Sequence, residues 1–172
     1  YPDHFETHYP KTKAIAEKHV LEANCPELAT VALRPHLIWG PRDQHLVPRL
    51  LERARNGRLR QVGDGQNLID MIYVENAAQA HLLAAKALTP SSAVGGNAYF
   101  ISQGQPVNCW KWINQILALA DIPPIRKSIS KPAAWYLGGV MELVHALLGR
   151  TSEPPMTRFL AAQLATHHYF DI

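Results

Sequence analysis

The spacing of apolar residues changes several times along the chain, and each change indicates a new element of secondary structure. Residues 29–39 form an apolar run that predicts a buried strand. Apolar residues at 68–74 and 97–102 predict further strands, and residues 59–62 predict a short one. Turns that contain glycine end several of these runs.

Between these strands, apolar residues recur at helical spacing. The predicted helices cover residues 9–24, 46–57, 75–88, 109–120 and 131–149, and one more lies within residues 152–172. Asn76 is expected to cap the third helix, Gly57 to end the second, and Gly138-Gly139 to interrupt the fifth. Strands that alternate with helices indicate an α/β fold with a largely parallel sheet. From about residue 104 helices dominate, which indicates a smaller second lobe.

Composition and charge exclude some classes of protein. The net charge of +3 and the pI of about 9.0 are too mildly basic to indicate a nucleic-acid partner. Cys25 and Cys109 lie far apart, and no cluster of His, Cys, Asp or Glu has the spacing of metal ligands. We therefore expect a reduced, cytoplasmic protein that holds no metal.

Tyr9 and Lys13 form the only Tyr-x-x-x-Lys motif in the chain. At positions i and i+4 of a helix, the two side chains share one face. A phenol with a pKa near 10 is a poor base at neutral pH, but an adjacent ammonium group favours the phenolate. Such a pair can exchange a proton with an alcohol or ketone while hydride passes to or from a cofactor. An ordinary solvated helix face also contains this motif by chance, so its context decides between the two interpretations.

Three motifs occur in order along the chain: YPKTKAIAEKHVL at residues 9–21, VALRPHLIWGPRD at residues 31–43 and LIDMIYVENAAQAHLLAA at residues 68–85. With these motifs the chain resembles the extended short-chain dehydrogenase/reductases over nearly its whole length. It is most similar to the 3β-hydroxysteroid dehydrogenase branch, which includes sterol-4-carboxylate 3-dehydrogenases and bacterial reductases of 3-oxo acids. The resemblance implies the C-terminal part of a Rossmann-type, doubly wound parallel sheet plus a small, mostly helical substrate-binding lobe.

The resemblance also implies roles for particular residues. Tyr9 would be the catalytic acid/base and Lys13 its activator, and both would contact the cofactor, NAD or NADP. The end of the strand at residues 29–39 would border the nicotinamide ring. The cofactor-binding residues there would be Pro35, His36, Leu37 and Ile38. The implied reaction interconverts a 3-hydroxy and a 3-oxo group on a hydrophobic small molecule, either sterol-like or long-chain.

The same resemblance divides the chain in two. Residues 1–103 would be the remainder of the NAD(P)-binding Rossmann domain, with an excursion into the substrate lobe near residues 58–70. Residues 104–172 would be the C-terminal substrate-binding lobe. The family's Gly-x-x-Gly-x-x-Gly loop, which seats the cofactor's pyrophosphate, does not occur in the sequence. We therefore expect the C-terminal portion of a longer protein, inactive by itself.

The apolar stretch at residues 131–149 is the candidate for contact with substrate. Its apolar residues fall mostly on one broad helical face, and Trp135 and Met141 are the proposed substrate-binding residues. The alternative is a helix that only packs on its neighbours. The stretch is charged and shorter than the roughly 18 to 20 apolar residues of a spanning helix, but it could contact a membrane surface peripherally. The resemblance also leaves a homodimer open.

Two other functions fit the sequence. A nucleotide-sugar epimerase or dehydratase of the same superfamily would share the Tyr9–Lys13 motif. A basic run would attract the phosphates of its substrate, although a solvated helix face explains the run equally well. This run consists of Arg42, Arg49, Arg53, Arg55, Arg58 and Arg60. The second alternative is a non-catalytic binding module that has kept the fold.

Overall fold

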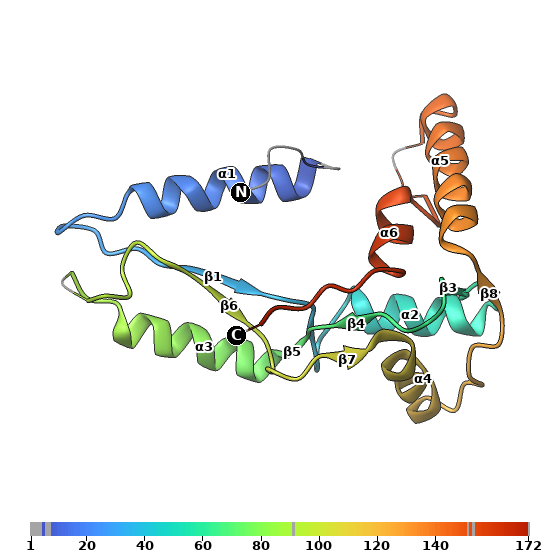
Figure 1. The fold of residues 1–172 in the computed structure, drawn as a ribbon, viewed down its shortest axis with the longest axis horizontal. Coiled ribbons are helices and arrows are strands. Elements are labelled where there is room, and N and C mark those ends of the chain that lie inside the picture. The colour runs from blue at the N-terminus through green and yellow to red at the C-terminus, as the bar shows by residue number, and fades with distance from the viewer. Residues whose placement is uncertain (1–4, 6–7, 91, 151, 153, 172) are drawn as a thin grey trace. The chain divides into compact units, whose positions relative to one another are not determined.

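The computed structural model describes residues 5, 8–90, 92–150, 152 and 154–171 (Figure 1). It consists of two compact units, each built from segments that are separate in the sequence. Unit 1 comprises Tyr1–Pro41, Met71–Gly104 and Phe170–Ile172. Unit 2 comprises Arg42–Asp70 and Gln105–Tyr169.

Unit 1 is an α/β arrangement of two parallel strand pairs and two helices. Its elements are α1 (His8–Glu22), β1 (Ala32–Pro35), β2 (Ile38–Trp39), β5 (Ile72–Tyr73), α3 (Val74–Ala87) and β6 (Ala98–Ile101). Strand β1 pairs in parallel with β6, and β2 pairs in parallel with β5. Helices α1 and α3 lie on opposite sides of the β1–β6 pair (Figure 1). The parallel pairs and flanking helices confirm the expected fold class.

The predicted strand at residues 29–39 is in fact two short strands. It breaks between β1 and β2 because Leu37 adopts a left-handed backbone with a φ of 42°. The strand residues are also only half-buried, and Ile38 is exposed, so the prediction of one buried strand was wrong. Gly40 follows with a φ of 141°, and a Cβ atom there would lie 2.7 Å from Val74 Cγ1. Glycine is therefore required where this turn contacts the start of α3.

Asn76 does not cap α3 as expected. The helix begins directly after β5, so Tyr73 takes the N-cap position and Asn76 lies inside the first turn. The Asn76 amide Nδ2 instead donates to Oε1 of Gln103 at 2.9 Å, and that oxygen also accepts from the backbone N–H of Tyr73 at 3.2 Å. Asn76 therefore joins the start of α3 to the segment that follows β6.

Unit 2 is mostly helical and contains short strand pairs. Its elements are α2 (Leu46–Arg55), β3 (Gln61–Val62), β4 (Leu68–Ile69), β7 (Val107–Asn108), α4 (Cys109–Leu119), β8 (Ser128–Ile129), α5 (Lys131–Leu147) and α6 (Arg158–Gln163). Strand β3 pairs in parallel with β8, and β4 pairs antiparallel with β7. The buried side chains of α4 are Cys109, Trp110, Ile113 and Leu117. These side chains give unit 2 a dense apolar core around one amphipathic helix.

Side chains cap the helices of unit 2 at their N-termini. Asn108, Ser130 and Thr157 each accept a hydrogen bond from the backbone of the first turn that follows. Asp43 accepts from three backbone N–H groups at the start of α2, at 2.7 to 3.0 Å. Burial alone would raise the pKa of Asp43, but these hydrogen bonds outweigh it and hold the pKa below its ordinary value.

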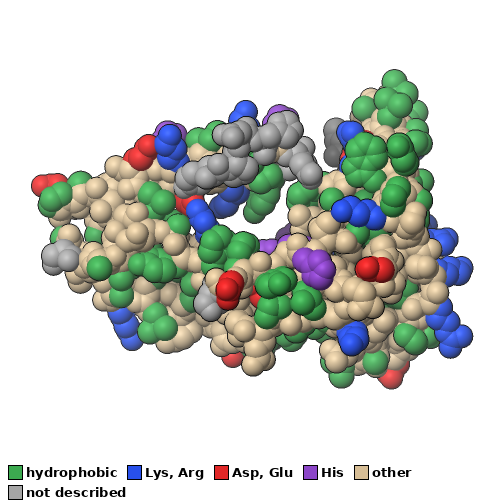
Figure 2. Space-filling model, viewed as in Figure 1, with side chains coloured by type: hydrophobic (Ala, Val, Ile, Leu, Met, Phe, Trp, Pro, Cys, Tyr) green, Lys and Arg blue, Asp and Glu red, His purple; other side chains and the backbone are tan. Residues whose placement is uncertain are grey.

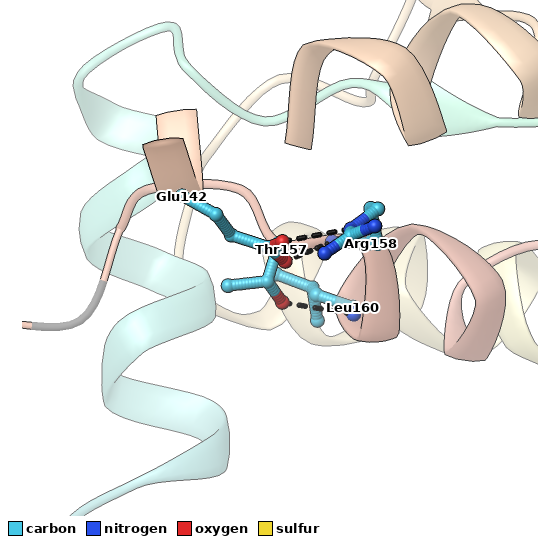
Figure 3. Close-up of polar contacts among 4 residues, drawn as sticks. All are labelled: Glu142, Thr157, Arg158 and Leu160. Carbon is cyan, nitrogen blue, oxygen red and sulfur yellow. Dashed lines mark hydrogen bonds and ion pairs between the residues drawn. The ribbon is translucent and has the colours of Figure 1, made fainter. Parts of the chain in front are cut away.

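Helix α5 is continuous, so the expected interruption at Gly138-Gly139 was wrong. Gly138 is buried, and a Cβ atom there would lie 2.6 Å from the carbonyl carbon of Thr157 and 2.7 Å from the nitrogen of Arg158. The missing side chain therefore lets the start of α6 contact the backbone of α5. The Glu142 carboxylate joins the two helices (Figure 3) by accepting from Arg158 N and Nε, both at 2.8 Å.

Replacing Gly138 by alanine should destabilise unit 2. We expect Gly138→Ala to lower the free energy of unfolding by about 1–3 kcal/mol, because the added methyl group meets backbone atoms that cannot move independently. Gly139→Ala is the matched control, since its Cβ would meet only Arg158 Cδ at 3.5 Å, an ordinary contact. The control should be neutral or stabilising by up to about 1 kcal/mol, because alanine favours the helix. Urea denaturation followed by circular dichroism measures both, and equal effects would contradict the close approach.

The two cysteines should differ in reactivity. Cys25 is exposed, whereas Cys109 is buried in α4. Burial raises the pKa of the Cys109 thiol to about 11, against a smaller lowering by a hydrogen bond to the Asn67 side chain. At pH 8 roughly one Cys109 in a thousand would be the reactive thiolate. With an aromatic disulfide reagent at pH 8, one thiol should react rapidly and the second only after denaturation. Cys25→Ser should abolish the rapid phase, and two rapid thiols in the native protein would refute the burial.

Candidate functional site

Tyr9 and Lys13 lie in the first turns of α1, on one exposed side of the helix. The Tyr9 side chain is 73% exposed, and Lys13 is exposed as well. The Tyr9 carbonyl accepts from Thr12 Oγ1 at 2.9 Å, which stabilises the first turn. Both functional groups are therefore accessible to a ligand that approaches α1.

The predicted cofactor-binding residues lie together at the carboxyl end of β1. Pro35 ends β1, His36 and Leu37 form the break, and Ile38 begins β2. The His36 N–H donates to the carbonyl of Ile101 at the end of β6, at 3.3 Å. The carbonyl of Leu37 accepts from Ile72 N, also at 3.3 Å. The break is thus fixed to both neighbouring strands at an edge of the kind where open α/β sheets bind ligands.

An ion pair joins the helix of Tyr9 and Lys13 to this strand. Arg34 Nε donates to Glu17 Oε2 at 2.7 Å, and Arg34 Nη2 donates to Glu17 Oε1 at 2.5 Å. The Arg34 guanidinium also lies over the ring of Phe100, with Cζ 4.8 Å from the centroid. Arg34 lies within the motif at residues 31–43 and Glu17 within the motif at residues 9–21, but neither residue was predicted to have a role in the site. The sequence pattern that could have identified Glu17 is its position four residues after Lys13 in the same predicted helix.

In unit 2, Trp135 and Met141 both lie on α5, but not on one narrow face. Six residues separate them, which places them about 120° apart around the helix. Trp135 is 43% exposed and Met141 is half-buried. The Arg158 guanidinium lies over the Trp135 ring, 5.4 Å from its centroid. Trp135 is therefore partly exposed to solvent beside the Arg158 cation, and the Met141 side chain is partly covered by its neighbours.

Helix α5 exposes an unusually large apolar surface, and Figure 2 shows hydrophobic side chains gathered over it. The exposed large residues on this helix are Trp135, Tyr136, Leu137, Val140, Leu143, Val144 and Leu147. Among the described residues no helix is long and apolar enough to cross a membrane. The exposed surface of α5 is thus available to another apolar molecule.

Unit 2 also contains an open groove of about 840 Å³. It lies between the end of α2, the end of α4 and residues 120–127, and its polar lining residues are Arg55, Asp121, Arg126 and Lys127. Neither Trp135 nor Met141 lines it. Within the part of the chain that the structure describes, no group of three or more His, Cys, Asp or Glu residues could hold a metal ion.

Solved structures define the class of protein by its fold. A dTDP-glucose 4,6-dehydratase double mutant from Streptomyces venezuelae, crystallised with NAD, is similar with a TM-score of 0.57 at 18% identity, over 75% of this chain and 40% of that one. The RMD protein from Pseudomonas aeruginosa, crystallised with NADPH, is similar with a TM-score of 0.54 at 20% identity, over 74% of this chain and 45% of that one. At this identity the likeness concerns the fold alone, which is a Rossmann-type fold.

Relatives with similar sequences identify the family within this fold. The 2-alkyl-3-oxoalkanoate reductase of Stenotrophomonas maltophilia is 54% identical over 172 residues, which is all of this chain and 52% of that protein. The mouse sterol-4-alpha-carboxylate 3-dehydrogenase, decarboxylating, is 35% identical over 168 residues, or 95% of this chain and 46% of that protein. The model of the 3-beta hydroxysteroid dehydrogenase/isomerase family matches residues 1–129. The chain belongs to this family.

These findings confirm the expected family and the fold, and the relatives are named as reductases and dehydrogenases. The chain spans about half the length of the curated relatives it matches. The roles of Tyr9, Lys13, Pro35 to Ile38, Trp135 and Met141 remain predictions.

Proposed function

We propose that the whole protein is an NAD(P)-dependent oxidoreductase that interconverts 3-hydroxy and 3-oxo groups on a hydrophobic substrate. The observation that carries the proposal is the placement of Tyr9 and Lys13 four residues apart on an exposed side of α1, which an ion pair joins to the end of β1. The substrate class follows the relatives, whose names specify an alkyl-3-oxoalkanoate and a sterol carboxylate. Both molecules carry an oxygen at carbon 3 and a large apolar body.

The residues at the strand end fit a nicotinamide ring. Pro35, His36 and Leu37 are half-buried and Ile38 is exposed, so they offer a mostly apolar edge with fixed backbone. A nicotinamide cofactor held by these residues would supply hydride for the substrate carbonyl carbon, or accept it in the reverse reaction. Tyr9 donates its phenolic proton to the carbonyl oxygen during reduction and takes it back during oxidation. The Lys13 ammonium favours the phenolate and has donors left for the ribose hydroxyls of the cofactor.

One part of the chain would bind the cofactor and the other the substrate. Residues 1–103, without the excursion near residues 58–70, would be the remainder of the cofactor-binding domain, and residues 104–172 would be the substrate lobe. The parallel strand pairs of unit 1 and the helices of unit 2 support a division of this kind, although the segment that joins unit 2 is longer, Arg42–Asp70, and Phe170–Ile172 belongs to unit 1. The sequence contains no Gly-x-x-Gly-x-x-Gly loop for the pyrophosphate, so we expect these 172 residues to show no turnover by themselves.

The exposed apolar side of α5 supports a hydrophobic substrate. Trp135 and Met141 would contact the apolar body of this substrate, and the exposed apolar residues of α5 could meet the membrane surface from which a lipid is taken. A homodimer stays a prediction. The likeness to nucleotide-sugar enzymes extends to the fold alone, whereas the reductase and dehydrogenase relatives match at 35–54% identity, which favours the oxidoreductase. A substrate panel of sterols, acyl ketones and nucleotide sugars separates the two functions.

Tyr9→Phe in the whole protein should lower turnover roughly a hundredfold or more, because the variant lacks the phenolic proton. The aromatic ring remains, so its packing should be unchanged. The variant's dissociation constant for the cofactor should change less than about threefold. Lys13→Ala should weaken both turnover and cofactor binding, because one ammonium group serves both. Steady-state kinetics and fluorescence titration measure these effects. Tyr99→Phe and Lys11→Ala are the matched controls and should behave as wild type; wild-type turnover in Tyr9→Phe would refute the assignment.

Trp135→Ala and Met141→Ala should raise the Michaelis constant for long or polycyclic substrates more than for short ones. The reason is that each variant removes apolar contact with the distal part of the substrate. Leu119→Ala is the control, because Leu119 is 85% exposed on a different helix. Equal effects on every substrate length, or an effect on thermal stability alone, would show that α5 serves packing.

A further inference from the structure

We propose that the ion pair between Glu17 and Arg34 is a positioning device for Tyr9 and Lys13. It fixes the rotation of α1 on β1 and thereby the direction in which both side chains face. The inference rests on the proposed function. Neither residue touches the reacting atoms in this account, because both act through α1 and β1.

The pair has the geometry of a strong interaction. Two N–H groups of one guanidinium meet the two oxygens of one carboxylate at 2.7 and 2.5 Å, in the bidentate arrangement that adds both direction and strength. The Glu17 side chain is only 15% exposed and that of Arg34 is 35% exposed, so water screens the pair weakly. The neighbouring pair Lys18–Glu22 differs in every respect: it lies within α1, spans 3.7 Å, and both side chains are more than half exposed.

Helix periodicity connects the pair to the predicted catalytic residues. Tyr9, Lys13 and Glu17 follow at intervals of four residues, and each step turns only about 40° around the helix axis. Glu17 lies about 6 Å along the axis from Lys13 and about 12 Å from Tyr9. When Glu17 faces β1, Lys13 is therefore turned about 40° and Tyr9 about 80° away from that direction, which leaves both side chains exposed beside the face that meets β1. A rotation of α1 that broke the pair would turn both of them away together.

Apolar packing does little to hold α1 in this rotation. The helix has no buried residue, and its apolar side chains Ile15 and Val20 are 47% and 43% exposed. A second contact lies at its far end, where Thr30 Oγ1 donates to the carbonyl of Val20 at 2.7 Å. Glu17 is nearer to Tyr9 than Val20 is, so the ion pair has a larger influence on the first turns of α1 than the Thr30 contact has.

Arg34 is itself held by a second contact, with an aromatic ring. Strand register places it beside Phe100 on β6, and its guanidinium lies over that ring. Phe170 from the C-terminal segment stacks on Phe100 with centroids 3.9 Å apart, and its ring also meets His36 edge-on at 5.5 Å. The same aromatic pair therefore supports both the arginine and one wall of the predicted cofactor site. Lysine could not replace this arginine, because it has neither the planar fork nor the stacking face.

The experiment compares Glu17→Gln and the charge-conserving Glu17→Asp in the whole protein, with Glu22→Gln as the matched control on the same helix. We expect Glu17→Gln to lower kcat at least about tenfold and Glu17→Asp several-fold, since displacements of about 1 Å cost up to a hundredfold. The Michaelis constant for the cofactor should change less than about threefold in both. The solvent deuterium isotope effect on kcat should rise, because proton transfer from a displaced Tyr9 becomes slower than the other steps. Glu22→Gln should leave all three quantities at wild-type values.

The outcomes separate this inference from the proposed function. If Tyr9→Phe abolishes turnover but both Glu17 variants keep kcat and the isotope effect while only Tm falls, the pair is merely structural and the inference is overturned. If Tyr9→Phe keeps turnover, the proposed function itself fails. If Glu17→Gln does not fold, Glu17→Asp decides, because it retains the charge: wild-type kcat in that variant overturns the inference, and a lower kcat at wild-type Tm supports it.

Discussion

The parallel pairing of β1 with β6 is the interaction on which unit 1 depends. Its register places Arg34 opposite Phe100, so that their side chains lie next to each other on one face of the strand pair. From this position Arg34 reaches Glu17 on α1, and Phe100 receives the ring of Phe170. The same pairing places the carbonyl of Ile101 where the N–H of His36 can donate to it. A shift of one residue would turn Arg34 away from α1 and would remove all of these contacts together.

The helices could be predicted from the sequence because apolar spacing is a local property. Helix α2 ends before Gly57, which has a φ of 64°, as its sequence position indicates. The errors concern residues whose reasons lie far away in the chain. Asn76 has the chemistry of a cap, but its partner is Gln103, 27 residues later. Gly138 looks like a helix breaker, but the backbone of Thr157 and Arg158 requires it. No local pattern contains such partners.

In the candidate site, too, features with a local sequence pattern could be predicted, and contacts between residues distant in the sequence could not. Tyr9 and Lys13 could be proposed from their spacing alone, because residues i and i+4 always share a helix face. The grouping of Pro35 to Ile38 came from family resemblance, and the break at Leu37 that shapes this group was not predicted. Glu17 could have been noticed at the next interval of four. Its partner Arg34 could not, because only the packing of α1 against β1 brings the two together.

The order in which the strands pair has a consequence for how the chain folds during synthesis. Ala32 of β1 pairs with Ala98 of β6, and Gln61 of β3 pairs with Ser128 of β8, so each pair waits for more than sixty residues of intervening chain. Long loops of this kind close slowly, because the chain loses conformational entropy on closing before the strand contacts that stabilise it have formed. At roughly 5–20 residues per second, a ribosome needs seconds to complete either pair, and Phe170 emerges only near the end of this chain. Until then the edge of β1 that pairs with β6 stays open, and an open strand edge can pair with another chain.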